Sequence, residues 1–340
     1  MKFTKKQFVS LIIVLGLAYF LAAFQLPYYI YKPGGADALN PIVSVEDGYQ
    51  SQGDMHLVTV SGGQATPIQY VWAKLLPHHE ILPIEEVRPE GITDDEYMHA
   101  QLQMMENSQE ASTVVAYEAA QEDITIDFNG VYVVSVVDGM PADGKLEMGD
   151  RIIGIDDTEV KEADDLINYV ESKKANDTIE VEFIRKDERK VEEIQLQAFE
   201  DAENKIGIGI QLVTDRSVSV EPKIEFSSGS IGGPSAGLMF SLEIYDQLTE
   251  QDITKGHEIA GTGEIDYDGN VYRIGGIDKK VIAADEEGVD IFFAPNEEGR
   301  EGSNYQVAAS TAEEIDTDMK IVPVDTFQDA LDYLETIEPK

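Results

Sequence analysis

The stretch that best indicates the fold is Gly232–Gly237 (Gly-Gly-Pro-Ser-Ala-Gly), followed directly by the apolar run Leu238–Tyr245. The run predicts a largely buried helix. The glycines permit a tight turn before it, and Pro234 suits a first helical turn, where its missing N–H costs nothing. Ser235 is then expected at the positive end of the helix dipole, beside unpaired backbone N–H groups. Such a serine combines an exposed hydroxyl with donors for an oxyanion, as a peptide-hydrolysing nucleophile requires.

A serine nucleophile also needs a group that accepts its proton, and Lys279 and Lys280 are the downstream candidates. On the helix expected over 277–287, the apolar side chains gather on one face. Lys280 lies at the border of this face, whereas Lys279 points away from it. Burial beside apolar groups lowers the pKa of a lysine and gives the neutral amine that a base needs. The pattern favours Lys280, although either lysine taken alone is better explained as a solvated surface charge.

Composition limits the class of protein. The chain has 340 residues, enough for two or three domains, and a formal net charge of −41. Nucleic acid is not an expected partner, because phosphate binding needs the opposite charge. The acidity fits a solvated, repulsive surface and also a protein that faces salty or alkaline surroundings. The absence of cysteine excludes disulfides and thiolate metal sites.

The N-terminal segment reads as a membrane anchor. It is almost wholly apolar from Phe8 to Ile30, long enough to cross a bilayer as one helix. The preceding lysines predict a cytoplasmic N-terminus and an extracytoplasmic remainder, with residues 1–33 forming the cytoplasmic end and the anchor. A cleaved signal peptide is the alternative, which the length of the apolar run disfavours. Three tyrosines fall where an interfacial aromatic belt is expected: Tyr28, Tyr29 and Tyr31.

Residues 34–121 are expected to begin as a linker punctuated by proline and glycine. A strand is predicted over 55–60, ending at Ser61-Gly62-Gly63. Thr93–Glu96 has the form of a capping box and predicts a helix over about 95–120, with room for a break.

Residues 122–199 combine a β-rich run over 130–137, a turn followed by a second strand within 145–155, a helix over about 163–173 and another strand over 178–185. The pattern Leu-x-x-Gly-Asp-x-Ile-x-x-Ile at 146–155 and this order of elements resemble a PDZ domain. PDZ domains bind an extended peptide by adding it to a sheet edge beside a helix. The resemblance assigns the groove lining to Leu166 and Val170, for which ordinary core positions are the alternative. It assigns the carboxylate-binding loop to four residues: Phe128, Asn129, Gly130 and Val131.

Residues 200–340 contain three motifs in order: Gly-Pro-Ser-Ala-Gly at 233–237, Thr-Gly-Glu at 262–264 and Arg-Ile-Gly-Gly-Ile-Asp-Lys-Lys at 273–280. Together they resemble the proteolytic domain of Lon-type proteases. The resemblance implies that Ser235 and Lys280 form a catalytic dyad, that Thr262 orients the lysine, and that Gly233 replaces an Asp found in many Lon proteases. Segments near 58–61 and 105–108 resemble the opening of the same domain.

We therefore predict an α+β fold in which one transmembrane helix precedes a Lon-type proteolytic domain, with a PDZ domain either inserted into it or appended. The chain resembles the membrane-bound, PDZ-containing Lon-like peptidases of Gram-positive bacteria, a group that includes SepM-like enzymes that trim secreted peptide pheromones. The resemblance implies an endopeptidase for peptides or unfolded protein segments and leaves a homo-oligomeric ring open. The chain has no Gly-x-x-x-x-Gly-Lys-Ser/Thr loop, so we expect no use of ATP, and neither a cofactor nor a metal.

Other classes of protein fit the sequence less well. A metalloprotease would need a His-Glu-x-x-His helix, and the histidines near 78–79 and at 257 do not complete one. A trypsin-like protease would need a Gly-Asp-Ser-Gly-Gly segment, which is absent. A membrane-tethered PDZ scaffold with an inactive protease fold is the main alternative, and the retention of both Ser235 and Lys280 argues against it. Whether the PDZ module recruits substrate or gates the active site is left open.

Overall fold

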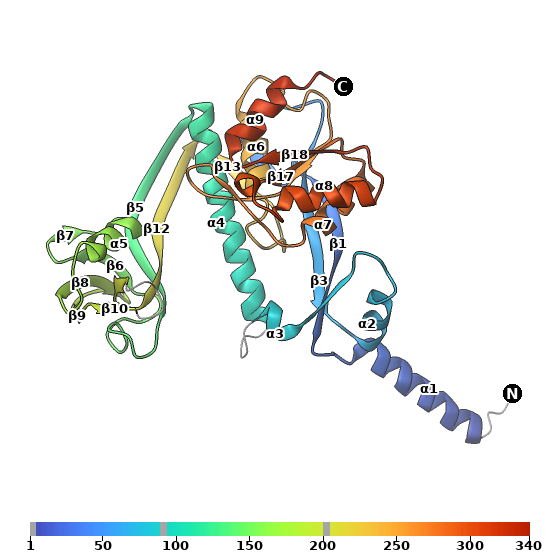
Figure 1. Ribbon diagram of the computed structural model, residues 1–340, viewed down its shortest axis with the longest axis horizontal. Helices are drawn as coiled ribbons and strands as arrows, with labels where there is room; N and C mark the ends of the chain where they lie inside the picture. Colours follow the sequence, from blue (N-terminus) through green and yellow to red (C-terminus); the bar gives the residue numbers. More distant parts are fainter. Residues whose placement is uncertain (1–4, 89–93, 200–204) are drawn as a thin grey trace. The chain divides into compact units, whose positions relative to one another are not determined.

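The computed structural model describes residues 5–88, 94–199 and 205–340 (Figure 1). The chain divides into two compact units, unit 1 (Met1–Asp123 and Val220–Lys340) and unit 2 (Ile124–Ser219). Unit 1 is thus built from two separate segments of the chain, and unit 2 from the segment between them. Both units combine helices with sheets, so the α and β content follows the prediction.

Unit 1 is organised around a six-stranded mixed sheet with the order β18-β17-β14-β3-β1-β4. Strand β3 runs antiparallel to β1 and parallel to β14, so it joins the two segments of unit 1. The strands are β1 (Tyr28–Ala38), β3 (Met55–Gln64), β4 (Glu80–Pro83), β14 (Ile259–Gly261), β17 (Ile291–Pro295) and β18 (Lys320–Val324).

Helices cover both faces of this sheet. Helices α7 (Ile277–Glu287) and α8 (Asn304–Glu314) pack on one face, in a core that includes Val58 and Phe292. On the other face, the ring of Phe293 meets that of Tyr333 in α9 (Phe327–Thr336). Because adjacent strand residues point to opposite faces, Phe292 packs on the face covered by α7 and α8, and Phe293 packs on the face covered by α9.

Helix α6 (Gly237–Leu248) also contacts the sheet at β3, and α4 (Asp94–Ala120) packs against α6. The predicted helix after Ser235 is therefore present, and every residue of α6 except Tyr245 is buried. Helix α4 runs without the break that the sequence allowed. Thr93, the first residue of the predicted capping box, lies outside the described residues.

Helix α7 occupies the predicted range and ends at Gly288, whose φ of +84° gives the left-handed C-terminal cap that glycine favours. The remaining elements of unit 1 are short: β2 (Val43–Val45), α2 (Pro67–Ala73), α3 (Ile84–Val87), β13 (Ile224–Phe226), β15 (Glu264–Ile265), β16 (Val271–Tyr272) and the 3₁₀ helix η1 (Glu297–Gly299).

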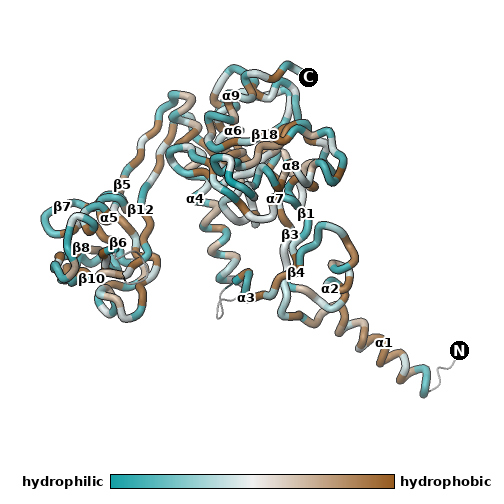
Figure 2. Tube along the Cα trace, viewed as in Figure 1, coloured by the Kyte–Doolittle hydropathy of each residue, from teal (hydrophilic) through white to brown (hydrophobic). Residues whose placement is uncertain are grey.

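Helix α1 (Lys5–Ala23) is the apolar N-terminal helix, and its trace is almost continuously hydrophobic in Figure 2. By length and composition it can cross a membrane, a test that a signal sequence also passes. The predicted span over 8–30 is too long, because Pro27 precedes β1 and the aromatic residues after it suit a strand. The three tyrosines assigned to an aromatic belt therefore lie in β1, and residues 34–38 belong to the same strand rather than to a linker. Strand β3 likewise continues through Gly62 and Gly63 instead of ending there.

Unit 2 has its own core around a sheet with the order β12-β5-β6-β8-β9. Strands β5 and β12 are neighbours in this sheet and are also the strands by which the chain enters and leaves the unit. The elements are β5 (Asp123–Val136), β6 (Arg151–Ile155), β7 (Thr158–Glu159), α5 (Ala163–Glu171), β8 (Thr178–Arg185), β9 (Glu188–Gln195), β10 (Gln197–Ala198), β11 (Ile206–Gly207) and β12 (Ile210–Glu221).

Candidate active site

Ser235 lies in the turn that leads into α6, two residues before the helix begins at Gly237. Pro234 is therefore outside the helix, not in its first turn as predicted, because Ala236 is the N-cap. Gly233 adopts a φ of +92°, and its N–H donates to the carbonyl of Gln101 in α4 at 2.8 Å. This left-handed backbone explains why glycine suits position 233.

Gly237 is required for a different reason, a close approach. A Cβ at this position would lie 2.7 Å from Cγ2 of Ile265 and 3.0 Å from Oγ of Ser108. The hydroxyl of Ser108 also donates to the carbonyl of Pro234 at 3.0 Å. The turn that presents Ser235 is thus held between α4 and the strand region around Ile265, and only a residue without a side chain fits its last position.

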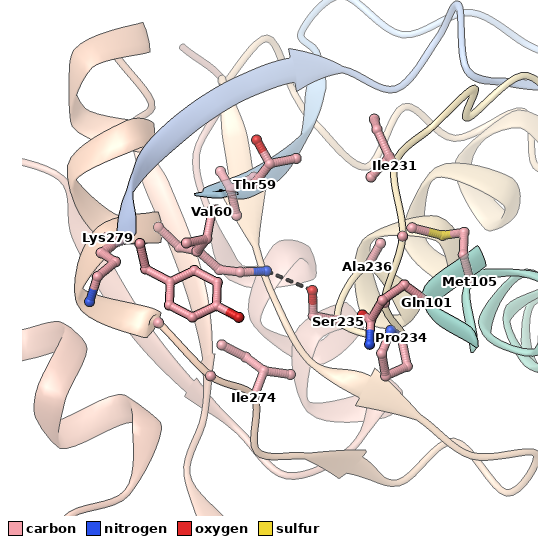
Figure 3. A pocket seen from close by; sticks show the side chains of 18 of the residues that line it. Thr59, Val60, Gln101, Met105, Ile231, Pro234, Ser235, Ala236, Ile274 and Lys279 are labelled. Carbon is pink, nitrogen blue, oxygen red and sulfur yellow. Dashed lines mark hydrogen bonds between the residues drawn. The ribbon is translucent and has the colours of Figure 1, made fainter. Parts of the chain in front are cut away.

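The structure brings Ser235 and Lys280 together. Nζ of Lys280 donates to Oγ of Ser235 at 2.7 Å, the bond that Figure 3 shows as a dashed line ending on Ser235. Lys280 lies in the first turns of α7, and the N–H of Lys280 donates to the carbonyl of Gly276 at 3.1 Å. The serine turn and the lysine helix are far apart in the sequence, and the sheet of unit 1 holds them in contact.

Thr262 completes a triangle with these two residues. Its hydroxyl accepts from Nζ of Lys280 at 2.9 Å and donates to the carbonyl of Ser235 at 2.9 Å. Thr262 follows β14 and is fully buried, and its N–H donates to the carbonyl of Phe293 at 3.0 Å. Since the single hydroxyl proton of Thr262 is used on the Ser235 carbonyl, only a lone pair of Thr262 faces the lysine.

Burial sets the protonation state of Lys280. The side chain is only 4% exposed, and this burial lowers the pKa of Lys280 from 10.5 to about 7. The cause is the loss of hydration of the charged ammonium, which hydrogen bonds to the neutral hydroxyls of Ser235 and Thr262. A large fraction of Lys280 is therefore neutral near pH 7 and can accept a proton.

Lys279 is as buried as Lys280, but its amine contacts carboxylates instead of hydroxyls. Its Nζ lies 2.9 Å from a carboxylate oxygen of Glu80 and 3.1 Å from one of Asp278. Burial alone would lower the pKa of Lys279, but the hydrogen bonds and charges of these two carboxylates outweigh it and raise the pKa. The surface position that sequence offered as an alternative for Lys279 is therefore wrong. In Figure 3 its side chain points away from Ser235, as the helix geometry predicted.

Ser235 and Lys280 open onto a cleft of about 870 Å³ in unit 1. Elements from both segments of unit 1 form its walls: β1, β3 and β4, the N-terminal half of α4, the loop 230–236 and the start of α7. The side chains nearest the serine in Figure 3 are mostly apolar. Four of them line the cleft: Val60, Met105, Ile231 and Ile274. Predominantly apolar walls with a few polar groups are typical of ligand-binding clefts.

The structure corrects the predicted PDZ groove. The four residues assigned to a carboxylate-binding loop, 128–131, lie inside strand β5, and Val131 is fully buried. Phe128 and Asn129 line a separate cleft of about 520 Å³. Leu166 and Val170 are 2% and 6% exposed and belong to the core of unit 2, which was the alternative for them.

The sequence reasoning missed a stretch that lies nearer to α5. Strand β11 contacts α5, and β12 is at the edge of the sheet in the strand order. The N–H of Ala163, the first residue of α5, donates to Oγ1 of Thr214 in β12 at 3.0 Å. The intervening segment Gly207–Ile210 reads Gly-Ile-Gly-Ile, and Gly209 has a φ of +81°. The carboxylate-binding loop of PDZ domains usually reads Gly-Leu-Gly-Phe. The alternation of glycine with apolar residues at 207–210 resembles that form more closely than residues 128–131 do, and this was the signal available in the sequence.

No cluster of three or more histidine, aspartate or glutamate side chains suited to a metal occurs within 5–88, 94–199 and 205–340. Nε2 of His56, a buried residue, lies 2.7 Å from a carboxylate oxygen of the partly exposed Glu258 within unit 1. His257, one of the histidines weighed for a metalloprotease, places Nε2 2.9 Å from the carbonyl of Glu338.

Two stretches of the chain match known domain families. Residues 97–196 match the PDZ domain, and residues 203–336 match the Lon protease (S16) C-terminal proteolytic domain. The chain therefore contains a PDZ domain and a Lon-type proteolytic domain, as the sequence resemblance implied.

Curated relatives point to the same proteolytic domain. The chain is 33% identical over 102 residues to the Lon protease of Mesomycoplasma hyopneumoniae, which covers 30% of this chain and 11% of that protein. It is 38% identical over 100 residues to the Lon protease of Campylobacter concisus, covering 29% and 11%. The chain thus spans about a ninth of the length of these relatives.

Among solved structures, the PDZ domain of the SdrC-like protein from Listeria monocytogenes is 40% identical, with 25% of this chain and 90% of that chain covered and a TM-score of 0.24. The PDZ domain of the SdrC-like protein from Listeria innocua is 37% identical, with 25% and 93% covered and a TM-score of 0.24.

Proposed function

We propose that this chain is a membrane-anchored, ATP-independent serine endopeptidase that uses a Ser235–Lys280 dyad to cleave flexible peptides or protein segments outside the cytoplasm. One observation carries the proposal: a buried lysine with a pKa near 7 lies 2.7 Å from a serine hydroxyl at the wall of a large cleft. Perturbed titratable groups that contact a nucleophile in a cleft are typical of catalytic sites.

Activation of the nucleophile follows from the triangle of hydrogen bonds. A neutral lysine amine has two protons and one lone pair. Because the hydroxyl of Thr262 presents a lone pair, one of those protons bonds to Thr262, and the lone pair of Lys280 can then face Oγ of Ser235. Thr262 therefore positions the base, and Lys280 takes the proton as Ser235 attacks a peptide carbonyl.

In the later steps Lys280 returns the proton that it took from Ser235. Attack forms a bond between Oγ of Ser235 and the carbonyl carbon, and the oxygen becomes an oxyanion that backbone N–H groups beside Ser235 can hold. Protonated Lys280 then gives its proton to the leaving amine as the C–N bond breaks, which leaves an acyl-enzyme and a neutral lysine. Water, deprotonated by the same lysine, hydrolyses the ester and regenerates the serine. Pro234 has no N–H and cannot contribute to the oxyanion site.

The substrate class follows from the cleft and from the sequence motifs. An extended segment must enter the cleft before Ser235 can reach its backbone. The chain has no phosphate-binding loop through which ATP could drive unfolding. We therefore infer that substrates are already flexible, as peptides, exposed loops or unfolded tails are, and that a secreted signalling peptide is one such substrate. The PDZ domain would add a second contact for an extended peptide.

The location follows from α1. Lysines precede its apolar run, and under the positive-inside rule this supports a cytoplasmic N-terminus, with the part of the chain that follows α1 lying outside.

The experiment uses the full chain in detergent micelles, without ATP, acting on a quenched fluorescent peptide of unstructured sequence. Ser235→Ala and Lys280→Ala should each lower kcat/KM by about 10⁴-fold. Lys320→Ala, an exposed lysine on β18, is the matched control and should retain full activity.

Each outcome separates the candidate functions. Loss of turnover in both dyad variants, with unchanged circular dichroism, supports the dyad. Full turnover in either variant excludes that assignment. No turnover by the parent chain across varied peptides would favour a membrane-tethered PDZ scaffold with an inactive protease fold.

A further inference from the structure

Helix α2 and the turn after it carry an apolar stripe that faces outward. Its members follow the i, i+3, i+4, i+7, i+8 spacing of an amphipathic helix. A stripe of this kind normally packs into the core, yet here each side chain is at least 43% exposed. The outward stripe consists of Ile68 (44% exposed), Val71 (58%), Trp72 (57%), Leu75 (75%) and Leu76 (43%).

The local structure is well defined despite this exposure. Thr66 and Gln69 form a capping box at the start of α2. Beyond the helix, the N–H groups of Leu75 and Leu76 both donate to the carbonyl of Trp72, at 2.9 and 3.0 Å, so the turn continues the helical path. The buried contacts of this segment use small residues, Ala65 and Ala73, rather than the stripe.

The outward stripe lies at the end of the candidate membrane helix. Helices α1 and α2 are in contact, and α2 lies beside the C-terminal end of α1 in Figure 1. The N–H of Leu26 donates to the carbonyl of Ala65 at 2.8 Å, and the N–H of Ala65 donates to the carbonyl of Tyr28 at 2.8 Å. These bonds fix the start of α2 to the residues that leave α1, at the level where a spanning helix would emerge from the bilayer.

The charge around the stripe also suits a lipid surface. The chain has 66 acidic residues, yet none occurs between Met55 and His79. The one lysine of this stretch, Lys74, lies over the ring of Tyr70 at 4.7 Å. Carboxylates would be repelled by anionic headgroups, so their absence here, in so acidic a chain, is what a membrane-facing surface requires.

We propose that the outward stripe docks into the headgroup and acyl boundary of the bilayer that α1 spans, with Trp72 as its interfacial anchor. This inference rests on the proposed membrane anchoring by α1. Interfacial helices bind by burying an apolar face of this kind parallel to the membrane, and tryptophan is enriched at this depth.

Docking has a consequence for the catalytic cleft. Strand β4 begins at Glu80, four residues after Leu76, and both Glu80 and Leu82 line the cleft that holds Ser235. Glu80 is also the ion-pair partner of Lys279 at 2.9 Å, next to the proposed base. A docked α2 therefore holds one wall of the cleft close to the bilayer, and segments near the membrane surface become the favoured substrates.

The sequence supplies a direct probe, because Trp72 is the only tryptophan of the chain. The full chain would be reconstituted into vesicles of phosphatidylcholine and phosphatidylglycerol, with or without phosphatidylcholine brominated at carbons 6 and 7. Since α1 contains no tryptophan, quenching by bromine reports on α2 alone. We expect the emission of Trp72 to fall about twofold or more in the brominated vesicles, as for a side chain at the acyl boundary.

Variants test whether the stripe causes this quenching. Val71→Gln combined with Leu75→Gln should abolish most of it while leaving circular dichroism unchanged, because both side chains are exposed. Val307→Gln is the matched control: Val307 is a 38% exposed valine on α8 and should leave the quenching unchanged.

Vesicle flotation separates the two proposals. If the chain floats with vesicles but Trp72 is not quenched by bromine and is quenched by aqueous iodide, the docking proposal is wrong and the membrane anchor is supported. A Trp72 that is shielded from iodide but unquenched by bromine is covered by protein, such as a second copy, and also overturns it. A chain that does not float overturns the anchor and the docking together, whereas peptidase activity in detergent is independent of both.

Discussion

Lys279 and Lys280 are consecutive residues on α7 and are equally buried, yet their amines lie in opposite electrostatic surroundings. Lys279 is paired with two carboxylates, which raise its pKa, whereas Lys280 meets two hydroxyls and has a pKa lowered to about 7. The chain thus keeps one lysine charged and allows its neighbour to be neutral. This contrast makes the assignment of the base testable by substitutions that preserve charge.

Lys280→Arg should inactivate the peptidase. Arginine keeps the positive charge but stays protonated in proteins, so it cannot accept the proton of Ser235. We expect kcat/KM to fall by about 10³-fold or more, the range of general-base catalysis. Lys279→Arg is the control, because arginine can keep the ion pair with Glu80, and it should retain most of the activity. Comparable activity in the two variants would rule out Lys280 as the base.

The pH profile of the parent chain should have one limb set by Lys280. The neutral amine is the active form, so kcat/KM should rise with pH through an apparent pKa of about 7 and level off above it. Initial rates with a neutral peptide between pH 5 and 9 would measure this limb. A profile that is flat over that range, or that falls through pH 7, would contradict a neutral lysine base.

Thr262→Val should weaken catalysis without abolishing it. Valine has nearly the same shape but loses both the bond from Lys280 and the bond to the carbonyl of Ser235. We expect a loss of about 10- to 100-fold in kcat/KM, since hydrogen bonds of this kind contribute about 1.5–3 kcal/mol. Thr262→Ser keeps the hydroxyl and should recover most of the activity. If serine were no better than valine, packing rather than hydrogen bonding would explain the effect.

Glu243→Gln should stabilise the protein in a pH-dependent way. Burial inside α6 raises the pKa of Glu243 from 4.5 to about 7, against the opposing hydrogen bond from Gln247. The folded state therefore favours the protonated carboxyl, and its stabilisation is lost as the pH rises from 4.5 through 7. Glutamine avoids this loss, so its Tm should exceed that of the parent by about 3–5 °C at pH 8 and by less at pH 5.

The control for that measurement is Glu287→Gln, an exposed position at the end of α7. It should show no change of the Tm difference with pH. An equal gain for both variants at pH 8 would indicate a general effect of reduced negative charge rather than the burial of Glu243.

Local patterns predicted the elements that bury one clear face. Helix α7 was predicted with its observed bounds because its apolar periodicity and the glycine after it both mark the limits. The family resemblance selected Lys280 over Lys279, and the same periodicity supported that choice. The structure places Lys280 beside Ser235. The role of Thr262 came only from the family resemblance, since a threonine after a short strand has no distinctive local pattern.

What the sequence did not predict depends on distant contacts. The ion pair of Lys279 depends on Glu80, which lies far away in the sequence and belongs to β4, the strand that pairs with β1. The tyrosines of β1 extend the apolar run of α1, so hydropathy alone merged a strand with the helix before it. Residues 128–131 were assigned to a loop by the resemblance to PDZ domains, whereas the pairing of Val131 with Ile152 keeps that stretch in a strand.

The parallel pairing of Met55 with Ile259 has a further consequence, for the order in which the molecule assembles. It joins the two segments of unit 1, which are separated in the sequence by the whole of unit 2, so the paired residues are about 200 positions apart. Contacts between residues so far apart in the sequence form slowly. In a chain exported as proposed above, the middle segment can fold by itself, since its core is local. The sheet that unites Ser235 with Lys280 closes only once the C-terminal strands have emerged. Peptide cleavage would therefore begin after synthesis and transfer are complete, which would spare the cell a partly made, active protease.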